Sequence, residues 1–361
     1  MKALHILYSG IGGSASVVFS LLNENKRNFL IKQNVLFTGD NLSKDYKKKV
    51  NKTKNKYFFI KTKKFYPWLS WSKVFFKIYK EKPNLIFLHN FQLIPCLFYK
   101  FFFKTKVIYI DHQGTTLMRS KSFLSLVFSL LFFDYYVCVT KIKYYSFKKK
   151  FSFFKDKIRY VPNSVDTNFF QKNINIKQNK NFRIGMASRI ESGKKIKLII
   201  KTLKHQNLKT LNIIFFIAGD GNNLAKLKNY VRDENLQNKV KFEGFINDKK
   251  LKLWYKKLDL YVQATIGEGM SISIFEAMSM GVPVIGSNVD GIKNLLGKKQ
   301  YVGMLFNNTT QDLSKKIKYF YKLSYKSKKL FSKTQRQFVI NNYSSTIMFN
   351  NYKKIILKNI S

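Results

Sequence analysis

Acidic residues are scarce in this chain. Its 361 residues include 19 Asp and Glu against 67 Lys and Arg, so the net charge is +48. Such an excess first suggests a polyanionic partner, either nucleic acid or an anionic membrane. Arginine is scarce as well and occupies only Arg27, Arg119, Arg159, Arg183, Arg189, Arg232 and Arg336. Because arginine makes the bidentate contacts that read phosphates and bases, its scarcity argues against specific nucleic-acid recognition. We interpret most of the lysines as compositional drift toward AT-rich codons with a weak electrostatic role, and a dedicated polyanion-binding surface is the alternative.

Cysteine and long apolar runs are also nearly missing. Cys96 and Cys138 lie in apolar runs without CxxC spacing, which excludes a disulfide framework and a zinc site and fits a reducing cytosol. The longest apolar run, residues 123–140, is interrupted by Asp134 and is shorter than the ~20 residues that a spanning helix needs. We predict a buried helix followed by a strand there and leave an interfacial role open. No secretory signal is predicted at the N-terminus.

Short apolar segments alternate with longer helical ones along the whole chain. This alternation is typical of α/β folds, in which helices cover parallel sheets. The predicted strands are residues 3–8, 33–38, 57–60, 85–88, 107–110, 135–139, 158–161, 183–187, 211–218, 240–243, 258–262 and 283–286.

A polar stretch divides these strands into two sets. We predict two similar α/β domains, residues 1–165 and 182–335, joined by a linker at 166–181 and followed by a C-terminal helix at 336–361. No strand is predicted after residue 310.

A glycine-rich loop follows the first strand. Gly10, Gly12 and Ala15 satisfy the dinucleotide pattern GxGxxG/A, and the helix after them would present free amides and a positive dipole to a phosphate. A nicotinamide or flavin site would also need an acid after the second strand, and Asp40, the only candidate, lies beyond the usual spacing. The loop therefore predicts a phosphate-binding turn, and a tight structural turn is the alternative.

The second domain carries two carboxylates eight residues apart, Glu268 and Glu276. Glu268 is expected in the loop after a strand and Glu276 within the following helix, where both can face the carboxyl edge of the sheet. The amides of residues 269–271 could hold a phosphate at the start of that helix.

The stretch from Glu268 to Ile285 resembles the signature of the retaining glycosyltransferase family GT4, with its Glu-x7-Glu followed by Ala-Met-x-x-Gly-Val-Pro-Val. Residues 189–194, 160–166, 218–221 and 240–245 are similar to further family motifs in the same order. The resemblance implies the GT-B fold, with two Rossmann-like domains facing across a cleft and a C-terminal helix packing back toward the N-terminal domain.

The resemblance also implies roles for individual residues. Glu276 would bind the ribose of a nucleotide-sugar donor, and Glu268 would contact the transferred sugar and take part in catalysis. Arg189 and Lys194 would pair with the diphosphate. The remaining donor contacts are expected at Gly12, Gly13, Phe245, Ile246, Gly269, Met270 and Ser271.

A cation pair can stabilise the negative charge on a departing nucleotide diphosphate without a metal, so no metal and no other cofactor is expected. We prefer a same-face substitution that retains the anomeric configuration.

Three histidines follow or lie within predicted strands. His112 comes two residues after the predicted strand 107–110, and the resemblance places a histidine there beside the reacting sugar, so His112 is the second predicted catalytic residue. His89 is open between a place in the cleft and one in the core. His5 is predicted to be structural, and His205 to lie at the surface.

The expected substrates are a nucleotide-diphosphate sugar and a lipid-linked or cell-surface polysaccharide or lipopolysaccharide precursor of a bacterial type. The alternatives are a basic nucleic-acid-binding protein, or a cytosolic enzyme acting on a soluble sugar. Ser271 replaces a glycine of the family pattern and leaves the donor sugar open. Lysine and aromatic residues at 61–68 and 98–106 either bind anionic headgroups, which would hold a cytoplasmic enzyme at the inner face of the membrane, or form ordinary solvated helices and loops.

Overall fold

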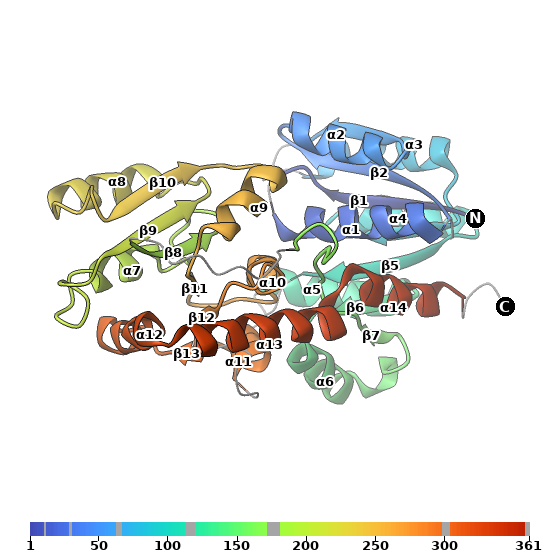
Figure 1. Cartoon of the computed structure of the whole chain (residues 1–361). Coiled ribbons are helices and arrows are strands. Elements are labelled where there is room, and N and C mark those ends of the chain that lie inside the picture. The colour runs from blue at the N-terminus through green and yellow to red at the C-terminus, as the bar shows by residue number, and fades with distance from the viewer. Residues whose placement is uncertain are drawn as a thin grey trace. The chain divides into compact units, whose positions relative to one another are not determined.

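The computed structural model describes residues 1–10, 12–28, 31–62, 67–112, 120–171, 181–297 and 304–357. They form two compact units, residues 1–164 with 345–361 and residues 165–344. Each unit contains one parallel sheet with helices packed on it (Figure 1). None of the helices in the described ranges combines the length and the apolar character needed to cross a membrane.

The first unit has a seven-stranded sheet in the order β3-β2-β1-β4-β5-β6-β7. Its strands are β1 (Lys2–Tyr8), β2 (Lys32–Gly39), β3 (Tyr57–Lys61), β4 (Leu85–Leu88), β5 (Lys106–Asp111), β6 (Tyr135–Cys138) and β7 (Ile158–Tyr160). Its helices are α1 (Gly13–Asn28), α2 (Lys44–Lys52), η1 (Pro67–Ser70), α3 (Trp71–Glu81), α4 (Leu93–Phe102), α5 (Ser120–Phe132), α6 (Lys141–Lys150), η2 (Ser152–Phe154) and α14 (Ser345–Leu357).

Alternate residues of the central strand β1 supply the two faces of this sheet. Leu4 and Ile6 pack with α3, α4 and α5, whereas Leu7 packs with α1 and α2. Helix α14 packs against α1, and there the Ser345 hydroxyl donates a 2.8 Å hydrogen bond to the buried Glu24 carboxylate. The end of the chain thus belongs to the first unit.

The second unit has a six-stranded sheet in the order β10-β9-β8-β11-β12-β13. Its strands are β8 (Phe182–Ala187), β9 (Ile213–Ala218), β10 (Val240–Gly244), β11 (Leu260–Gln263), β12 (Val284–Ser287) and β13 (Met304–Phe306). Its helices are α7 (Ile196–Thr202), α8 (Leu224–Asp233), α9 (Asp248–Lys256), α10 (Ile272–Ser279), α11 (Asp290–Leu296), α12 (Thr310–Lys322) and α13 (Tyr325–Tyr343).

The structure confirms every predicted strand within a few residues, as well as a helix and a strand at residues 123–140. The helix is not fully buried as predicted, because Leu124 and Leu131 of α5 are 68% and 51% exposed. Strand β13 was not predicted, because three residues are too few for a readable alternation.

The C-terminal helix predicted at 336–361 is instead two helices, α13 and α14. Ser344 interrupts them in an extended conformation (φ −70°, ψ 153°) and forms a parallel bridge with Val165. The predicted linker at 166–181 lies largely outside the described residues.

Candidate functional site

The strand order of the second sheet creates a point at which successive connections leave in opposite directions. Strand β8 continues to β9 on one side, and its other neighbour is β11. Open α/β sheets bind ligands at the carboxyl edge of such a point. The loops after β8 and β11 meet there, where the Lys195 amide donates to the Ala264 carbonyl at 3.0 Å and the Ile266 amide to the Gly193 carbonyl at 3.1 Å.

These two loops bring Lys194 and Glu268 together. The Lys194 ammonium forms a short ion pair with Oε2 of Glu268, and both side chains are largely buried, with exposed fractions of 21% and 17%. The pair joins the predicted diphosphate-binding cation to the predicted sugar-binding carboxylate, which the sequence alone did not link.

A polar layer beneath Glu268 supports it. The Gln263 amide nitrogen donates to Glu268 Oε2 at 3.3 Å, and the Tyr261 hydroxyl donates to Gln263 Oε1 at 2.8 Å. Tyr261 is fully buried, and burial, the leading cause, raises the pKa of its hydroxyl, so it stays a protonated donor. Sequence reasoning missed Gln263 and Tyr261, whose only signal was a polar residue at the end of a predicted strand.

Glu276 lies on α10 and is half-buried. It accepts a 2.9 Å hydrogen bond from the hydroxyl of Tyr255, a fully buried residue of α9. Burial first, and then the negative charge of Glu276, raises the pKa of Tyr255 well above its usual value. A permanently protonated phenol therefore orients this carboxylate.

Arg189 is exposed in the loop after β8, and its guanidinium forms no ion pair or hydrogen bond with the described residues. Its backbone carbonyl accepts a 3.2 Å hydrogen bond from the Ser188 hydroxyl. The loop is held by glycines of the next connection. A Cβ on Gly219 (φ 144°) would lie 1.9 Å from the Ser188 carbonyl oxygen, and one on Gly221 would lie 2.6 Å from that of Ile190. These close approaches explain the Gly-Asp-Gly sequence after β9.

The segment Gly269, Met270 and Ser271 leads into α10. Ser271 is the N-cap residue, but its side chain makes no capping hydrogen bond and instead contacts the Ser273 hydroxyl at 3.0 Å. The first amides of α10 therefore lack a side-chain cap, which suits the predicted phosphate contact. Gly291 packs so closely beneath that a Cβ there would lie 2.0 Å from the Glu268 carbonyl oxygen.

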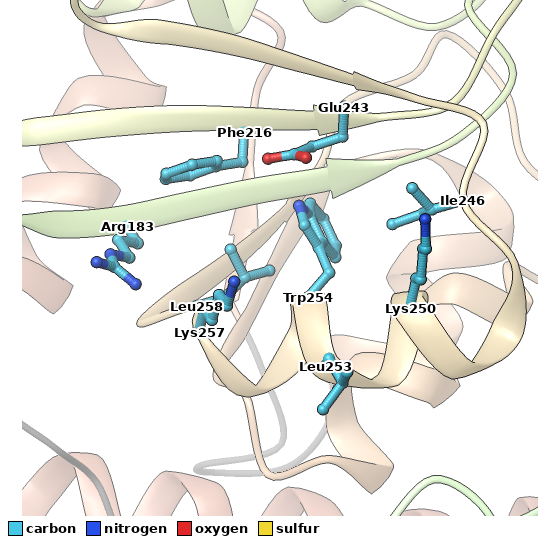
Figure 2. A pocket seen from close by; sticks show the side chains of 9 residues that line it. All are labelled: Arg183, Phe216, Glu243, Ile246, Lys250, Leu253, Trp254, Lys257 and Leu258. Carbon is cyan, nitrogen blue, oxygen red and sulfur yellow. The ribbon is translucent and has the colours of Figure 1, made fainter.

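A pocket of about 400 Å³ opens between α9 and the strands β9 and β10 (Figure 2). Its lining includes Trp254, Phe216, Glu243 and Ile246. Ile246 is next to Phe245, which is half-exposed, and both follow β10. The predicted base-binding segment thus lies at the rim of this pocket.

In the first unit, the glycine loop follows β1 and leads into α1, as predicted, although Ile11 lies outside the described residues. Gly12 has open space where a side chain would be, since a Cβ there would have no neighbour within 4 Å, and Gly13 begins α1. A ligand can therefore approach this backbone closely.

The three strand histidines also lie in the first unit. His89 follows β4 and His112 follows β5, and Nδ1 of His89 lies 3.0 Å from Nε2 of His112. His89 in turn lies 3.2 Å from buried His5. His5 is therefore not an isolated core residue, and His89 is part of the same row; sequence analysis treated the three separately. Within the described ranges no cluster of three His, Cys, Asp or Glu residues is arranged to hold a metal ion.

Comparison with known proteins finds a family that resembles the second unit. Residues 167–338 match the family model described as Glycosyl transferases group 1. The chain is 33% identical over 162 residues to the Escherichia coli UDP-Gal:alpha-D-GlcNAc-diphosphoundecaprenol alpha-1,3-galactosyltransferase, an alignment covering 41% of each protein. It is 29% identical over 168 residues to the O-antigen biosynthesis glycosyltransferase WclY of Escherichia coli, covering 44% of each. The chain thus spans less than half the length of these curated relatives.

The likeness to solved structures extends over the whole chain. The Anabaena protein Alr3699/HepE, solved in complex with UDP and glucose, superimposes with a TM-score of 0.82, 16% sequence identity and 99% coverage of both chains. At this identity the likeness concerns the fold, and it confirms the predicted GT-B class with two Rossmann-like domains.

Proposed function

We propose that this chain, whose residues 167–338 match the model of the glycosyl transferases group 1 family, transfers a sugar from a nucleotide-diphosphate donor to a glycan acceptor. The observation that carries the proposal is the contact between Lys194 and Glu268 at the carboxyl edge of β8 and β11. A cation and a sugar-binding carboxylate side by side suit the junction between a diphosphate and its sugar.

Different groups of the donor would bind to different residues along this edge of the sheet. Arg189, which is exposed, and Lys194, which is largely buried, supply positive charge for the diphosphate, whose negative charge rises as the glycosyl bond breaks. Glu276 holds the ribose hydroxyls in the orientation that Tyr255 imposes, and the segment around Phe245 and Ile246 holds the base. When the diphosphate binds Lys194, Glu268 exchanges part of its ion pair for a sugar hydroxyl.

This assignment can be tested by incubating the purified chain with a panel of UDP-, GDP- and ADP-sugars and measuring the release of nucleotide diphosphate. We expect one donor to be hydrolysed slowly without acceptor. Glu276→Ala and Arg189→Ala should each reduce the binding and the hydrolysis of that donor. The assignment fails if no donor binds, or if both variants behave as the unmodified chain.

We also propose that transfer needs no divalent metal and retains the anomeric configuration through same-face substitution. The cation pair supplies the charge that a metal would otherwise provide. Turnover should therefore persist in excess EDTA, and proton NMR of the first product should show the donor's anomeric configuration. An inverted product would contradict same-face substitution.

For the acceptor we propose a lipid-linked or polysaccharide precursor. The Escherichia coli relative is named for an acceptor carried on diphosphoundecaprenol, and WclY is named for O-antigen biosynthesis. A soluble sugar is the competing acceptor, and an acceptor panel containing both kinds decides between them.

An aromatic surface on the first unit supports a membrane-borne acceptor. Phe98, Phe101 and Phe102 occur at helical spacing on α4 and are 55%, 81% and 65% exposed. Helix α3 packs against α4 and exposes Phe76. We define these four residues as the aromatic surface. Exposed lysines Lys73, Lys80 and Lys104 occur on or beside the same helices, and each would contribute about 1 kcal/mol next to an anionic membrane.

We infer that this surface holds the enzyme at the inner face of the cytoplasmic membrane. Phe101→Ser together with Phe102→Ser should reduce co-sedimentation with phosphatidylglycerol vesicles, whereas Phe153→Ser, which changes an exposed aromatic of η2, should not. Equal losses in both variants would reduce the effect to general hydrophobicity and contradict a docking surface on α4.

A further inference from the structure

Three of the four histidines of the chain form a row in the first unit. The sheet places β1, β4 and β5 side by side, with His5 in the middle of β1, His89 just after β4 and His112 just after β5. Nδ1 of His5 lies 3.2 Å from Nε2 of His89, and Nδ1 of His89 lies 3.0 Å from Nε2 of His112. Phe87 stacks on His5 with 4.6 Å between ring centroids, which fixes the inner ring.

All three imidazoles are neutral at pH 7. Burial lowers the pKa of His5 to about 3, and a hydrogen bond donated by His5 to the Gln33 side chain only partly opposes this. Burial also lowers the pKa of His112 to about 4, against the opposing charge of Asp111. The pKa of His89 is well below its usual value because of burial and then its two histidine neighbours.

In a row of neutral imidazoles, all hydrogen bonds between the rings run in the same direction. Each ring carries one N–H donor and one acceptor nitrogen, so the two contacts are satisfied together only if every hydrogen is on Nε2 or every hydrogen is on Nδ1. In the first case His112 has a free acceptor at Nδ1, and in the second it has a free donor there. Whatever fixes the hydrogen on His5 therefore also fixes it on His112.

Gln33 lies at the inner end of the row. Nε2 of His5 and Oε1 of Gln33 are both buried, and neither has a hydrogen-bond partner of normal geometry among the described residues. Gln33 is nevertheless the side chain that favours a proton on His5. A hydrogen on Nε2 of His5 satisfies both atoms, whereas two facing acceptors would leave both unsatisfied, at a desolvation cost. Gln33 is 3% exposed, so water does not compete freely for its oxygen.

We propose that Gln33, acting through His5 and His89, holds His112 in the Nε2–H tautomer, so that His112 presents Nδ1 as a hydrogen-bond acceptor to a hydroxyl of the transferred sugar. Nδ1 of His112 is itself buried and has no partner among the described residues. This assignment rests on the proposed function, because the hydroxyl belongs to the donor. Gln33, His5 and His89 are then positioning residues, and His112 is the residue that touches substrate.

The tautomers can be measured without any substrate. Long-range ¹H–¹⁵N correlation spectra of the full chain labelled with ¹⁵N-histidine distinguish Nε2–H from Nδ1–H, and four histidines are few enough to assign by single substitutions. His205 serves as the internal reference, because its Nδ1 accepts a 3.2 Å hydrogen bond from the Asn207 amide. We expect the Nε2–H pattern for His5, His89 and His112 at pH 7, and Nδ1–H at His112 would overturn the proposal.

Two variants test the role of Gln33. Gln33→Met removes the acceptor at similar volume and should give His112 a second, Nδ1–H signal. Phe87→Leu loosens the stacking on His5 but removes no hydrogen-bonding atom, so His112 should keep one tautomer. The proposal is overturned if Gln33→Met leaves His112 unchanged, or if Phe87→Leu changes it equally.

Kinetics connects the tautomer to transfer. Gln33→Met should lower kcat/KM by roughly threefold to tenfold, the effect of losing one hydrogen bond. If the unmodified chain uses no donor at all, the proposed function fails while the tautomer result stands. If it does transfer sugar and Gln33→Met transfers it equally well, the assignment of Nδ1 to a sugar hydroxyl is overturned.

Discussion

The replacement Lys194→Met tests the centre of the candidate site. It keeps the length of the side chain and removes the charge that faces Glu268. If Lys194 stabilises the departing diphosphate, the loss belongs to the transition state, and kcat should fall by about 10²–10³-fold, as for other preorganised groups that stabilise developing negative charge. The KM for the donor should change much less if Arg189 binds the ground-state diphosphate as proposed.

The effect on stability can be bounded from the structure. Exposed ion pairs contribute about 0–1 kcal/mol, and breaking a fully buried pair costs about 3–5 kcal/mol. The exposed fractions of 21% and 17% place this pair between the two cases, and Glu268 keeps the 3.3 Å hydrogen bond from Gln263. We expect a loss of roughly 1–2 kcal/mol, or about 2–8 °C in Tm for a unit of this size, so the variant should fold.

The assay is initial-rate release of nucleotide diphosphate from the donor that the panel identifies. Lys195→Met is the matched control, because the adjacent lysine is exposed and Glu268 pairs with Lys194 instead. If Lys194→Met lowers kcat less than about threefold, or if Lys195→Met lowers it as much, the cation is not part of the reaction and the reasoning is refuted.

Three further predictions follow from the geometry. Tyr255→Phe removes the hydrogen bond that orients Glu276 and should raise the dissociation constant of the nucleotide by roughly threefold to tenfold in calorimetry with little change in kcat; an unchanged constant would argue against a ribose role for Glu276. Gly219→Ala adds a Cβ 1.9 Å from a carbonyl oxygen at φ 144° and should destabilise the chain by more than about 1 kcal/mol. Gly12→Ala meets no atom within 4 Å, so it should leave the melting temperature unchanged, and it should weaken donor binding if the phosphate approaches that backbone. Equal melting temperatures of the two variants would contradict this expectation. Because the pKa values of His5 (about 3) and His112 (about 4) are depressed in the folded chain, the unfolded chain binds protons that the folded chain does not bind. The free energy of unfolding should therefore fall below pH 6.5 by up to about 1.4 kcal/mol per pH unit for each histidine. Denaturant unfolding between pH 7 and pH 5 checks this, and His5→Phe should reduce the dependence of the unfolding free energy on pH.

For the candidate donor-site residues, the sequence predicted the loop or helix of each residue but not the side chains that it contacts. Glu268, Glu276, Arg189 and Lys194 lie in local motifs whose spacing places them after β8 and β11 and on α10. The pairing of Lys194 with Glu268 was not predicted, because it depends on which two loops meet at the sheet edge. Tyr255 was missed for a similar reason, since it reaches Glu276 from a separate helix.

The contacts between the three histidines depend on the sheet and could not be predicted from local sequence. The first sheet has the Rossmann order, in which the first strand lies beside the fourth and the fourth beside the fifth. That order places side by side the strand that contains His5 and the two strands that precede His89 and His112. Their contact also requires the register that pairs His5 with Phe87 and so places His89 beyond the end of the paired segment.

Register depends on packing across the whole sheet, whereas a motif depends on a few adjacent residues. A histidine at a strand end was therefore predictable as a functional candidate. The buried glutamine that sets its tautomer, on a different strand and two imidazoles away, was predictable only from the assembled sheet.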